Sequence, residues 1–492
     1  MNSPRSQAVL IPLFAAVLLL TCMNVFYINI RISNPWPNSA WEPVILLDSW
    51  RMVHPPAHPI YSMESPSPLT YGPMKAWTLG QAFKFTGPNL WMGRFFSLGS
   101  ALLATGILAW VWTRKRAPLF FIPAWCFLMT GNLVCKNYYV DARPDMEAIL
   151  FSVLGILAFY RGCERGKHAF CLLGTVCLVI GFFYKQTAAI WAAVPLVVVV
   201  LEWNRTVLKR KLLFAAFPLL VFFLLLIGMK LALPDLYRHM IEAASNHKTK
   251  PLNFLARVSH VMLYSPPLIA TLFCWLTADG FPWLKDSRLK WLIASAIVGV
   301  PACTYFASGG GGDLNSLIPV WLIFASFCVH SIDSFRGVLA QETVSFKRRM
   351  ATSCFLALLL MAPAGGHMLS LISWTCLTHG DEHYSSAIEC AKALPGRVIC
   401  PQDPGVVFFA KGYAGRSVYA ELDQRFTKGE WPNEVPQCVI DEVRQADWVI
   451  SVESGFGASG MISGLLAELK FQAVRFPDLD GSVYRVWRRT GK

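Results

Sequence analysis

Charged side chains are scarce in this chain of 492 residues, of which 15% are charged and 54% hydrophobic. A soluble globular protein carries roughly a quarter charged residues, so the composition indicates a polytopic membrane protein. The formal net charge of +14 does not indicate a nucleic-acid partner, because residues 378–492 hold 13 basic and 15 acidic side chains. The basic surplus lies in the apolar part, where it orients helices relative to the bilayer.

Several signatures of cofactor chemistry are missing as well. No C-x-x-C pair occurs among the 14 cysteines, so a zinc or redox centre has little support. No P-loop is present after residue 377, and no internal repeat is evident. Most cysteines lie inside apolar runs, as buried hydrophobic residues do. Four lie in or near the tail and could pair if the tail is extracytoplasmic, namely Cys376, Cys390, Cys400 and Cys438.

Apolar runs of about spanning length recur along the chain and predict a helical membrane fold of about eleven transmembrane helices. The first run has no clean small-residue cleavage site, so we interpret it as a retained anchor and not as a signal peptide. The predicted spans are residues 8–28, 92–112, 118–134, 146–161, 169–184, 187–201, 212–233, 261–278, 290–307, 316–332 and 350–372.

Lys and Arg clusters indicate the orientation of these spans. If the N-terminus is cytoplasmic, every dense basic cluster falls on the cytoplasmic side, as the positive-inside rule requires. We therefore expect an integral protein of a bacterial inner membrane, with residues 29–91 as a first periplasmic loop and with a periplasmic tail. The clusters lie at residues 113–116, 161–167, 205–211, 285–290 and 336–349.

The composition becomes that of a soluble protein near residue 378, which predicts a membrane domain at residues 1–377 and a small extracytoplasmic α/β domain at residues 378–492. We interpret the tail acids Asp403, Asp423 and Asp447 as surface or turn residues and expect no catalytic residue in the tail. Strands are predicted at residues 397–400, 406–409, 448–451 and 482–487, and helices at 439–445 and 462–469.

Asp48 is a lone carboxylate in the first predicted loop, which holds nine prolines from Pro35 to Pro73 and is expected to be irregular there. A carboxylate beside apolar surface tends to have a raised pKa and can accept a proton from a hydroxyl. The alternative is a structural role as the N-cap of a short helix. The end of the loop, residues 74–85, is predicted to form a short helix at the interface.

Two further polar groups lie at span ends. Asp141 and Asp145 flank Arg143 and could hold a sugar or a catalytic partner, although acids also suit a helix N-terminus. Lys185 stands between two apolar runs. An ionisable residue there is a functional candidate by default and could bind a lipid phosphate, whereas the alternative is a lysine that extends to the interface.

The last two polar groups lie in later loops of the same predicted side. The loop at residues 234–260 carries Arg238 and Lys248, which could bind phosphate or sugar, and three histidines whose spacing matches no common metal motif. Four glycines precede Asp313 and Asn315 and would let the backbone approach a ligand closely, or form a flexible turn. Five polar groups on one side would build a cavity.

The order of these features resembles the GT-C glycosyltransferases over roughly residues 8–372. The first span is followed by an acidic loop, then by Tyr71-Gly72-Pro73, Arg143-Pro144-Asp145 and Lys185-Gln186-Thr187. This superfamily includes the protein O-mannosyltransferases, lipid A aminoarabinose transferases and lipopolysaccharide-core galacturonosyltransferases. The resemblance implies a polyprenyl-phosphate-linked sugar donor, a hydroxyl acceptor on a glycolipid, glycan or protein, and transfer with inversion at the extracytoplasmic face.

The resemblance also implies roles for single residues. Asp48 would be the catalytic base, and Asp141 the second acid, with Asp145 as an alternative to Asp141. Ser49 follows Asp48, where several members have a second acid, so a divalent metal is not supported and no cofactor is expected. Lys185 would contact the donor phosphate, and the other expected substrate-binding residues are Arg143, Asp145, Tyr71, Arg238, Lys248 and Asn315.

Three other classes remain open. A transporter often shows repeats and helices broken near mid-membrane, whereas here the polar groups lie at span ends. A ligase or polymerase of lipid-linked glycans would carry a large polar loop late in the chain, whereas the longest predicted loop here is the first. A non-catalytic anchor for the tail would not require Asp48, Asp141 and Lys185 on one side.

Overall fold

The computed structural model describes most of the chain, and every structural statement below concerns the part it describes. These residues are 8–55, 60–62, 66, 68, 70–113, 120–135, 138–201, 208–247, 249–277, 286–309, 313–331, 345–375, 381–413, 415–425, 434–453 and 458–490.

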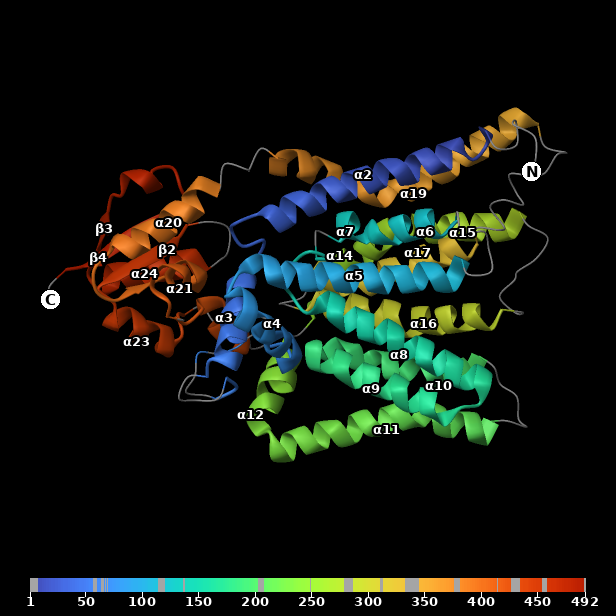
Figure 1. Ribbon diagram of the computed structural model, residues 1–492, viewed down its shortest axis with the longest axis horizontal. Coiled ribbons are helices and arrows are strands. Elements are labelled where there is room, and N and C mark those ends of the chain that lie inside the picture. Colours follow the sequence, from blue (N-terminus) through green and yellow to red (C-terminus); the bar gives the residue numbers. More distant parts are fainter. Residues whose placement is uncertain are drawn as a thin grey trace.

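Long helices run side by side and form a bundle, with the C-terminal elements gathered beyond one of its ends (Figure 1). A helix lies over each predicted apolar run. The bundle comprises α2 (Ile11–Ser33), α5 (Leu90–Thr113), α6 (Phe121–Met129), α7 (Gly131–Val134), α8 (Asp145–Arg165), α9 (His168–Tyr184), η2 (Gln186–Ala193), α10 (Val194–Leu201), α11 (Leu208–Ala232), α14 (Pro251–Tyr264), α15 (Pro266–Thr277), α16 (Ser287–Ser308), η5 (Leu314–Leu317), α17 (Ile318–His330) and α19 (Phe346–Thr375).

By length and composition, five helices in the described part can cross a membrane by themselves, or six if α14 and α15, which meet at a bend of 51°, count as one span. Four apolar helical stretches are shorter. The prediction of a helical integral membrane protein is confirmed, whereas the count of eleven spans is not. The five helices that pass are Ile11–Ser33, Leu90–Thr113, Asp145–Arg165, Phe214–Ala232 and Ser287–Ser308.

The segment around Asp48 is a helix, so the prediction of an irregular loop there is wrong. It forms α3 (Glu42–Val53), which packs against α4 (Pro73–Thr86), the helix that was predicted for residues 74–85. Pro43 lies in the first turn of α3, where its fixed φ suits a helix and its missing N–H costs nothing. The four residues from Val44 to Leu47 are all buried, because α3 lies between the bundle and the tail.

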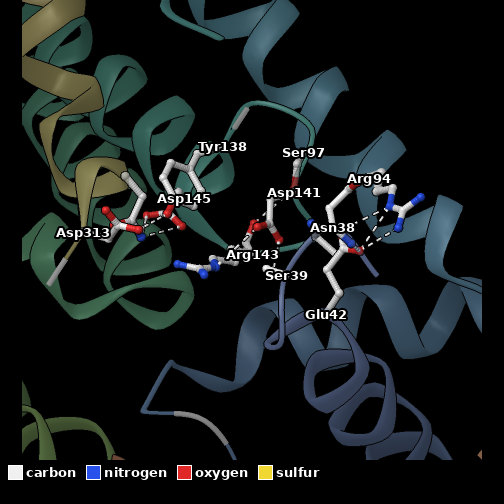
Figure 2. A network of polar contacts seen from close by, with 12 residues as sticks. Asn38, Ser39, Glu42, Arg94, Ser97, Tyr138, Asp141, Arg143, Asp145 and Asp313 are labelled. Carbon is white, nitrogen blue, oxygen red and sulfur yellow. Dashed lines mark hydrogen bonds and ion pairs between the residues drawn. The ribbon is translucent and has the colours of Figure 1, made fainter. Parts of the chain in front are cut away.

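A buried ion pair between Glu42 and Arg94 joins α3 to α5. The Nη2 atom of Arg94 lies 2.7 Å from Oε2 of Glu42, and neither side chain is exposed to solvent. Arg94 also donates to the backbone carbonyls of Arg31, Asn34 and Trp36 before α3. Oε1 of Glu42 accepts the backbone N–H of Ala142 at 3.0 Å. This pair therefore sets the positions of α3 and of the loop that carries Asp141 and Arg143 (Figure 2).

A second buried pair fixes α4. Lys75 on α4 donates to the carboxylate of Glu147 on α8, and to Ser97 on α5 at 3.1 Å. The hydroxyl of Ser97 in turn donates to the carbonyl of Arg143 at 3.1 Å. Three helices and the loop before α8 are thus held by one polar chain.

The tail is a small α/β unit, as predicted. Its mixed sheet has the order β1-β2-β4-β3, with β1 parallel to β2 and the other pairs antiparallel. The prediction of a strand at residues 406–409 is wrong, because these residues lie in a helix. The elements are α20 (Asp381–Ala393), β1 (Val398–Ile399), α21 (Pro404–Lys411), α22 (Val418–Gln424), α23 (Gln437–Gln445), β2 (Trp448–Val452), α24 (Ala458–Glu468), β3 (Phe471–Val474), η7 (Pro477–Leu479) and β4 (Tyr484–Arg489).

Tertiary packing outweighs strand propensity at residues 406–409. Pro404 begins α21, and Val406, Val407 and Phe408 are buried, with Phe408 packing against Trp50 of α3. A run of β-branched and aromatic residues that is buried on nearly all sides does not reveal its period. The cysteines at 390, 400 and 438 are free thiols, and Cys376 lies outside the described residues.

We predict that Arg94→Ala destabilises the protein strongly, because it leaves the carboxylate of Glu42 buried without its partner. Breaking one side of a buried ion pair costs about 3–5 kcal/mol, which a thermal unfolding scan of the detergent-solubilised protein would detect as a lower midpoint. The matched control is Lys392→Ala, which removes an exposed ion pair with Glu389 and should cost about 0–1 kcal/mol. Equal midpoints for the two variants would contradict the role of Arg94.

Candidate active site

A cavity of about 550 Å³ lies between the end of the bundle and the tail. Its lining mixes apolar side chains, such as Phe182, Leu226 and Phe306, with a small set of polar ones. A cavity of this size with few convergent polar groups is typical of a small-ligand site. The polar lining residues include Thr70, Tyr71, Arg143, Lys185, Gln186, His247, Asn315 and Asp423.

The Tyr71-Gly72-Pro73 element reaches this cavity because Gly72 has no side chain. A Cβ atom there would lie 2.0 Å from the carbonyl oxygen of Phe183, and the N–H of Gly72 donates to the carbonyl of Tyr184 at 3.3 Å. This close approach to the end of α9 brings the ring of Tyr71 to 5.8 Å from the Nζ atom of Lys185, within the range of a cation–π interaction.

Lys185, Asp145 and Asn315 meet at the inner wall of the cavity. Lys185 breaks the helix between α9 and η2, and its ammonium donates to the carboxylate of Asp145 at the start of α8. The amide of Asn315 donates to the same carboxylate at 3.1 Å. Lys185 is 9% exposed, so it does not extend into water along the interface. The structure joins these three predicted residues, which are widely separated in the sequence.

Arg143 forms the next part of the wall. Its guanidinium carbon lies 4.9 Å from the ring centroid of Tyr138 and 5.9 Å from that of Trp41, and its Nε atom lies 3.5 Å from Asp141. Asp141 itself accepts a hydrogen bond from Ser39 at 3.4 Å. Figure 2 shows Arg143 between Asp141 and Asp145. Asp141 thus orients Arg143 and is not among the lining residues.

Burial raises the pKa of the Asp141 carboxyl to about 6, although the charge of Arg143 opposes this shift. A low-dielectric site disfavours the charged carboxylate, and the nearby cation offsets only part of that cost. Asp141 therefore titrates close to neutral pH.

Asp48 lies beside the cavity and does not line it. Its carboxylate pairs with Arg51 at 3.3 Å, and Arg51 donates to the carbonyl of Gly415 in the tail at 3.0 Å. Tyr61 is close enough that the charge of Asp48 raises its pKa further, beyond the larger effect of burial. The hydroxyl of Tyr61 donates to the carbonyl of Tyr71 at 3.2 Å. Tyr61, whose pKa is influenced by the charge of Asp48, is therefore hydrogen-bonded to the lining residue Tyr71.

One predicted residue, Arg238, is not brought to the cavity wall. Arg238 is exposed on a π-helical turn, η3 (Arg238–Glu242), and does not line the cavity. Lys248 lies outside the described residues, as do the glycines at 310–312. In the part of the chain that the structure describes, no cluster of three or more His, Cys, Asp or Glu side chains could hold a metal ion.

The tail contributes a carboxylate that the sequence analysis misjudged. Asp423 on α22 is 7% exposed and lines the cavity, so its interpretation as a surface or turn residue is wrong. Thr70 donates to its Oδ2 atom at 3.1 Å, and Nε2 of His247 lies 3.4 Å from its Oδ1 atom. Burial raises the pKa of Asp423, while His247, Thr70 and Arg143 oppose the shift. Asp403 is also buried, and burial raises its pKa to about 7.

A signal for Asp423 was present in the sequence but could not be used alone. The mostly apolar run from Val418 to Leu422 is typical of a packed helix, yet only the tertiary structure shows that this helix is buried and faces the bundle. Gln424 beside it donates to the carbonyl of Pro68 in the first loop at 3.1 Å, which holds α22 against that loop.

Comparison with solved structures identifies the fold, and it agrees at the level of fold with the GT-C resemblance predicted from the sequence. The chain matches ArnT from Cupriavidus metallidurans in the apo state at a TM-score of 0.58 and 12% identity, covering 96% of this chain and 98% of that one. ArnT bound to undecaprenyl phosphate matches at 0.55 and 12%, with the same coverage.

An archaeal oligosaccharyltransferase shows the same fold. AglB from Archaeoglobus fulgidus, in complex with an inhibitory peptide and a dolichol-phosphate, matches at a TM-score of 0.55 and 11% identity, covering 94% of this chain and 72% of that one. No family model and no curated protein matches the sequence. At these identities the likeness establishes the fold, and the function is argued from the site.

We predict that Asp141 makes the stability of the protein depend on pH below neutrality. Its pKa is about 6 when folded and about 4 in an unfolded chain. Between these values the folded state holds more protons, so the free energy of unfolding falls as pH rises from about 4 to about 6. Asp141→Asn removes this contribution. As the pH rises from about 4 to about 6, the thermal midpoint of the wild type should therefore fall relative to that of Asp141→Asn. Parallel curves of midpoint against pH for the two proteins would contradict the assignment.

Proposed function

We propose that this protein is a membrane glycosyltransferase that moves a sugar from a polyprenyl-phosphate donor to a hydroxyl acceptor on the extracytoplasmic side, with inversion. The observation that carries the proposal is the pair of cations, Lys185 and Arg143, in a cavity at the ends of membrane-spanning helices. Two structures of this fold contain undecaprenyl phosphate and dolichol-phosphate, which supports a lipid-linked donor.

The inner wall suits a phosphate that is attached to a lipid. Lys185 pairs with Asp145, and Arg143 pairs with Asp141. The positive charge of each cation is therefore partly compensated by a carboxylate. Both line the cavity and can add charge-assisted hydrogen bonds to phosphate oxygens. Asn315 and Tyr71 border the same space and would orient the sugar. The apolar lining residues would contact the first units of the polyprenyl chain.

The chemistry needs few groups. The acceptor oxygen attacks the anomeric carbon, and the bond from that carbon to the phosphate oxygen breaks, with its electron pair passing to the polyprenyl phosphate. The cations stabilise this developing charge, so the leaving group needs no proton. The proton of the acceptor hydroxyl passes to a carboxylate base. A single displacement inverts the configuration.

Asp48 is the base that the family resemblance implies, and we keep that assignment as part of the proposal. Asp48 pairs with Arg51 and is not among the residues that line the cavity, so its carboxylate would act on the acceptor through a change of these contacts or through water. The acceptor is a glycolipid, glycan or protein hydroxyl, and the membrane is proposed to be a bacterial inner membrane with a cytoplasmic N-terminus. The N-terminal end of α2 lies far from the tail (Figure 1), which supports that topology.

The test of the function uses the full chain in proteoliposomes with a panel of synthetic polyprenyl-phosphate hexoses, pentoses and uronic acids. Each donor is combined with a glycolipid, an oligosaccharide or a hydroxyl-bearing peptide as the acceptor. We expect release of polyprenyl phosphate and glycosylation of one acceptor class. Uptake of solute without release from any donor would replace the proposal with a transporter.

We predict that Lys185→Ala lowers turnover by about 10²–10³-fold, the usual cost of removing one group that stabilises transition-state charge. Lys185→Arg should retain part of the activity, and Lys392→Ala on the tail surface should match the wild type. Turnover is measured as polyprenyl phosphate released, on variants that elute as the wild type does in gel filtration. Near-normal turnover of a folded Lys185→Ala variant would contradict the proposal that Lys185 binds the donor phosphate.

We predict that Asp48→Asn lowers kcat by about 10²–10⁴-fold, as expected when a general base is lost. Binding of undecaprenyl phosphate should persist, because Asp48 does not line the donor wall. The control is Glu389→Gln on the exposed face of α20. If Asp48→Asn changes the thermal midpoint but not kcat, Asp48 supports the structure and is not the base.

A further inference from the structure

We infer that Asp423, contributed by the C-terminal domain, binds a hydroxyl of the acceptor and determines which acceptors are used. This inference rests on the proposed transfer reaction and assigns the acceptor side of its cavity. It gives the tail a direct role in substrate recognition, because Asp423 lines the cavity.

The position of Asp423 favours the acceptor over the donor. Lys185 and Asp145 lie where membrane-spanning helices end, whereas Asp423 belongs to a helix of the tail. A donor with a lipid chain is anchored from the bundle side, and its phosphate lies against Lys185 and Arg143. The part of the wall made by Asp423 of α22, Ser245 and His247 is left for the group that arrives from water.

The contacts of Asp423 hold its carboxylate in a fixed orientation. Thr70 donates to one oxygen at 3.1 Å, and His247 lies 3.4 Å from the other. Tyr419, one turn earlier on α22, packs edge-to-face against Trp41 with ring centroids 6.2 Å apart. Gln424 anchors the end of the helix to the first loop. A carboxylate oxygen can accept more than one hydrogen bond, so capacity remains for a ligand.

The charge around Asp423 selects the chemistry of its partner. His247 adjoins the carboxylate, and Arg143 is near enough to lower its pKa. An ammonium group on the acceptor would meet the positive charge of Arg143, whereas a neutral hydroxyl can donate a hydrogen bond without repulsion. Asp423 is therefore suited to a polyhydroxylated or hydroxyl-bearing acceptor and not to a cationic one.

The test compares Asp423→Asn with the wild type, using the donor and acceptor that the proteoliposome panel identifies. A hydrogen bond to a charged group contributes about 1.5–3 kcal/mol, so the acceptor KM should rise by about 10–100-fold. The change in kcat should be much smaller, because Asp423 binds the acceptor and does not take its proton. Undecaprenyl phosphate, used as a binding probe, should bind Asp423→Asn as it binds the wild type.

A second variant and a control guard against misfolding. Thr70→Val keeps the carboxylate but removes the hydrogen bond that orients it, and should raise the acceptor KM in the same direction by a smaller factor. Asp441→Asn changes an exposed acid of the tail and should match the wild type. An unchanged acceptor KM, or a loss confined to kcat, overturns the inference, as does loss of undecaprenyl phosphate binding.

The two proposals fail in different ways. If the wild type releases polyprenyl phosphate from no donor, the transfer reaction itself is rejected, and the acceptor role of Asp423 falls with it. If the wild type transfers sugar and Lys185→Ala does not, but Asp423→Asn uses the acceptor normally, only the role of Asp423 is rejected.

Discussion

The buried pair of Glu42 and Arg94 is the constraint on which the rest of the site depends. Arg94 has no solvent exposure, so each of its donors must find an acceptor in the protein. It finds them on Glu42 and on the carbonyls before α3, while Glu42 also holds the backbone of Ala142. One ion pair therefore positions the helix that carries Asp48 and the loop that carries Asp141 and Arg143. Lys75 and Glu147 repeat this arrangement for α4, which follows the Tyr71 element.

The cavity is assembled from two parts of the chain with different physical environments. The bundle supplies cations at helix ends, where Lys185 and Arg143 are buried and each is held by one carboxylate. The tail supplies Asp423 from a helix that packs on Trp41 and on the first loop. The donor is proposed to be anchored in lipid, and the acceptor is proposed to come from water. A site between the bundle and the tail therefore lets the two substrates approach from different sides.

The sequence predicted much of this arrangement, and its failures have a common cause. The apolar runs located the helices, because length and hydropathy are local properties, and the order of the elements at Tyr71, Arg143 and Lys185 resembled that of the GT-C fold. The segment around Asp48 was misjudged because prolines at residues 35–73 suggested a loop, whereas Pro43 begins a helix. Residues 406–409 were misjudged as a strand, because a fully buried run shows no period. Glu42, Arg94 and Asp423 were missed, because their partners lie far away in the chain.

The sequence alone determined that this protein is a helical membrane protein with a small α/β tail, since composition and periodicity depend only on neighbouring residues. It also marked Lys185 and Asp145 as functional candidates, because charge at span ends is costly unless it is paired or lines a cavity. Only the tertiary structure decided which charges meet. Asp145 pairs with Lys185, Asp141 pairs with Arg143, and Asp48 pairs with Arg51. Asp423 of the tail lines the cavity. The physical reason is that a buried charge must be paired, and the available partner is set by packing, not by sequence order.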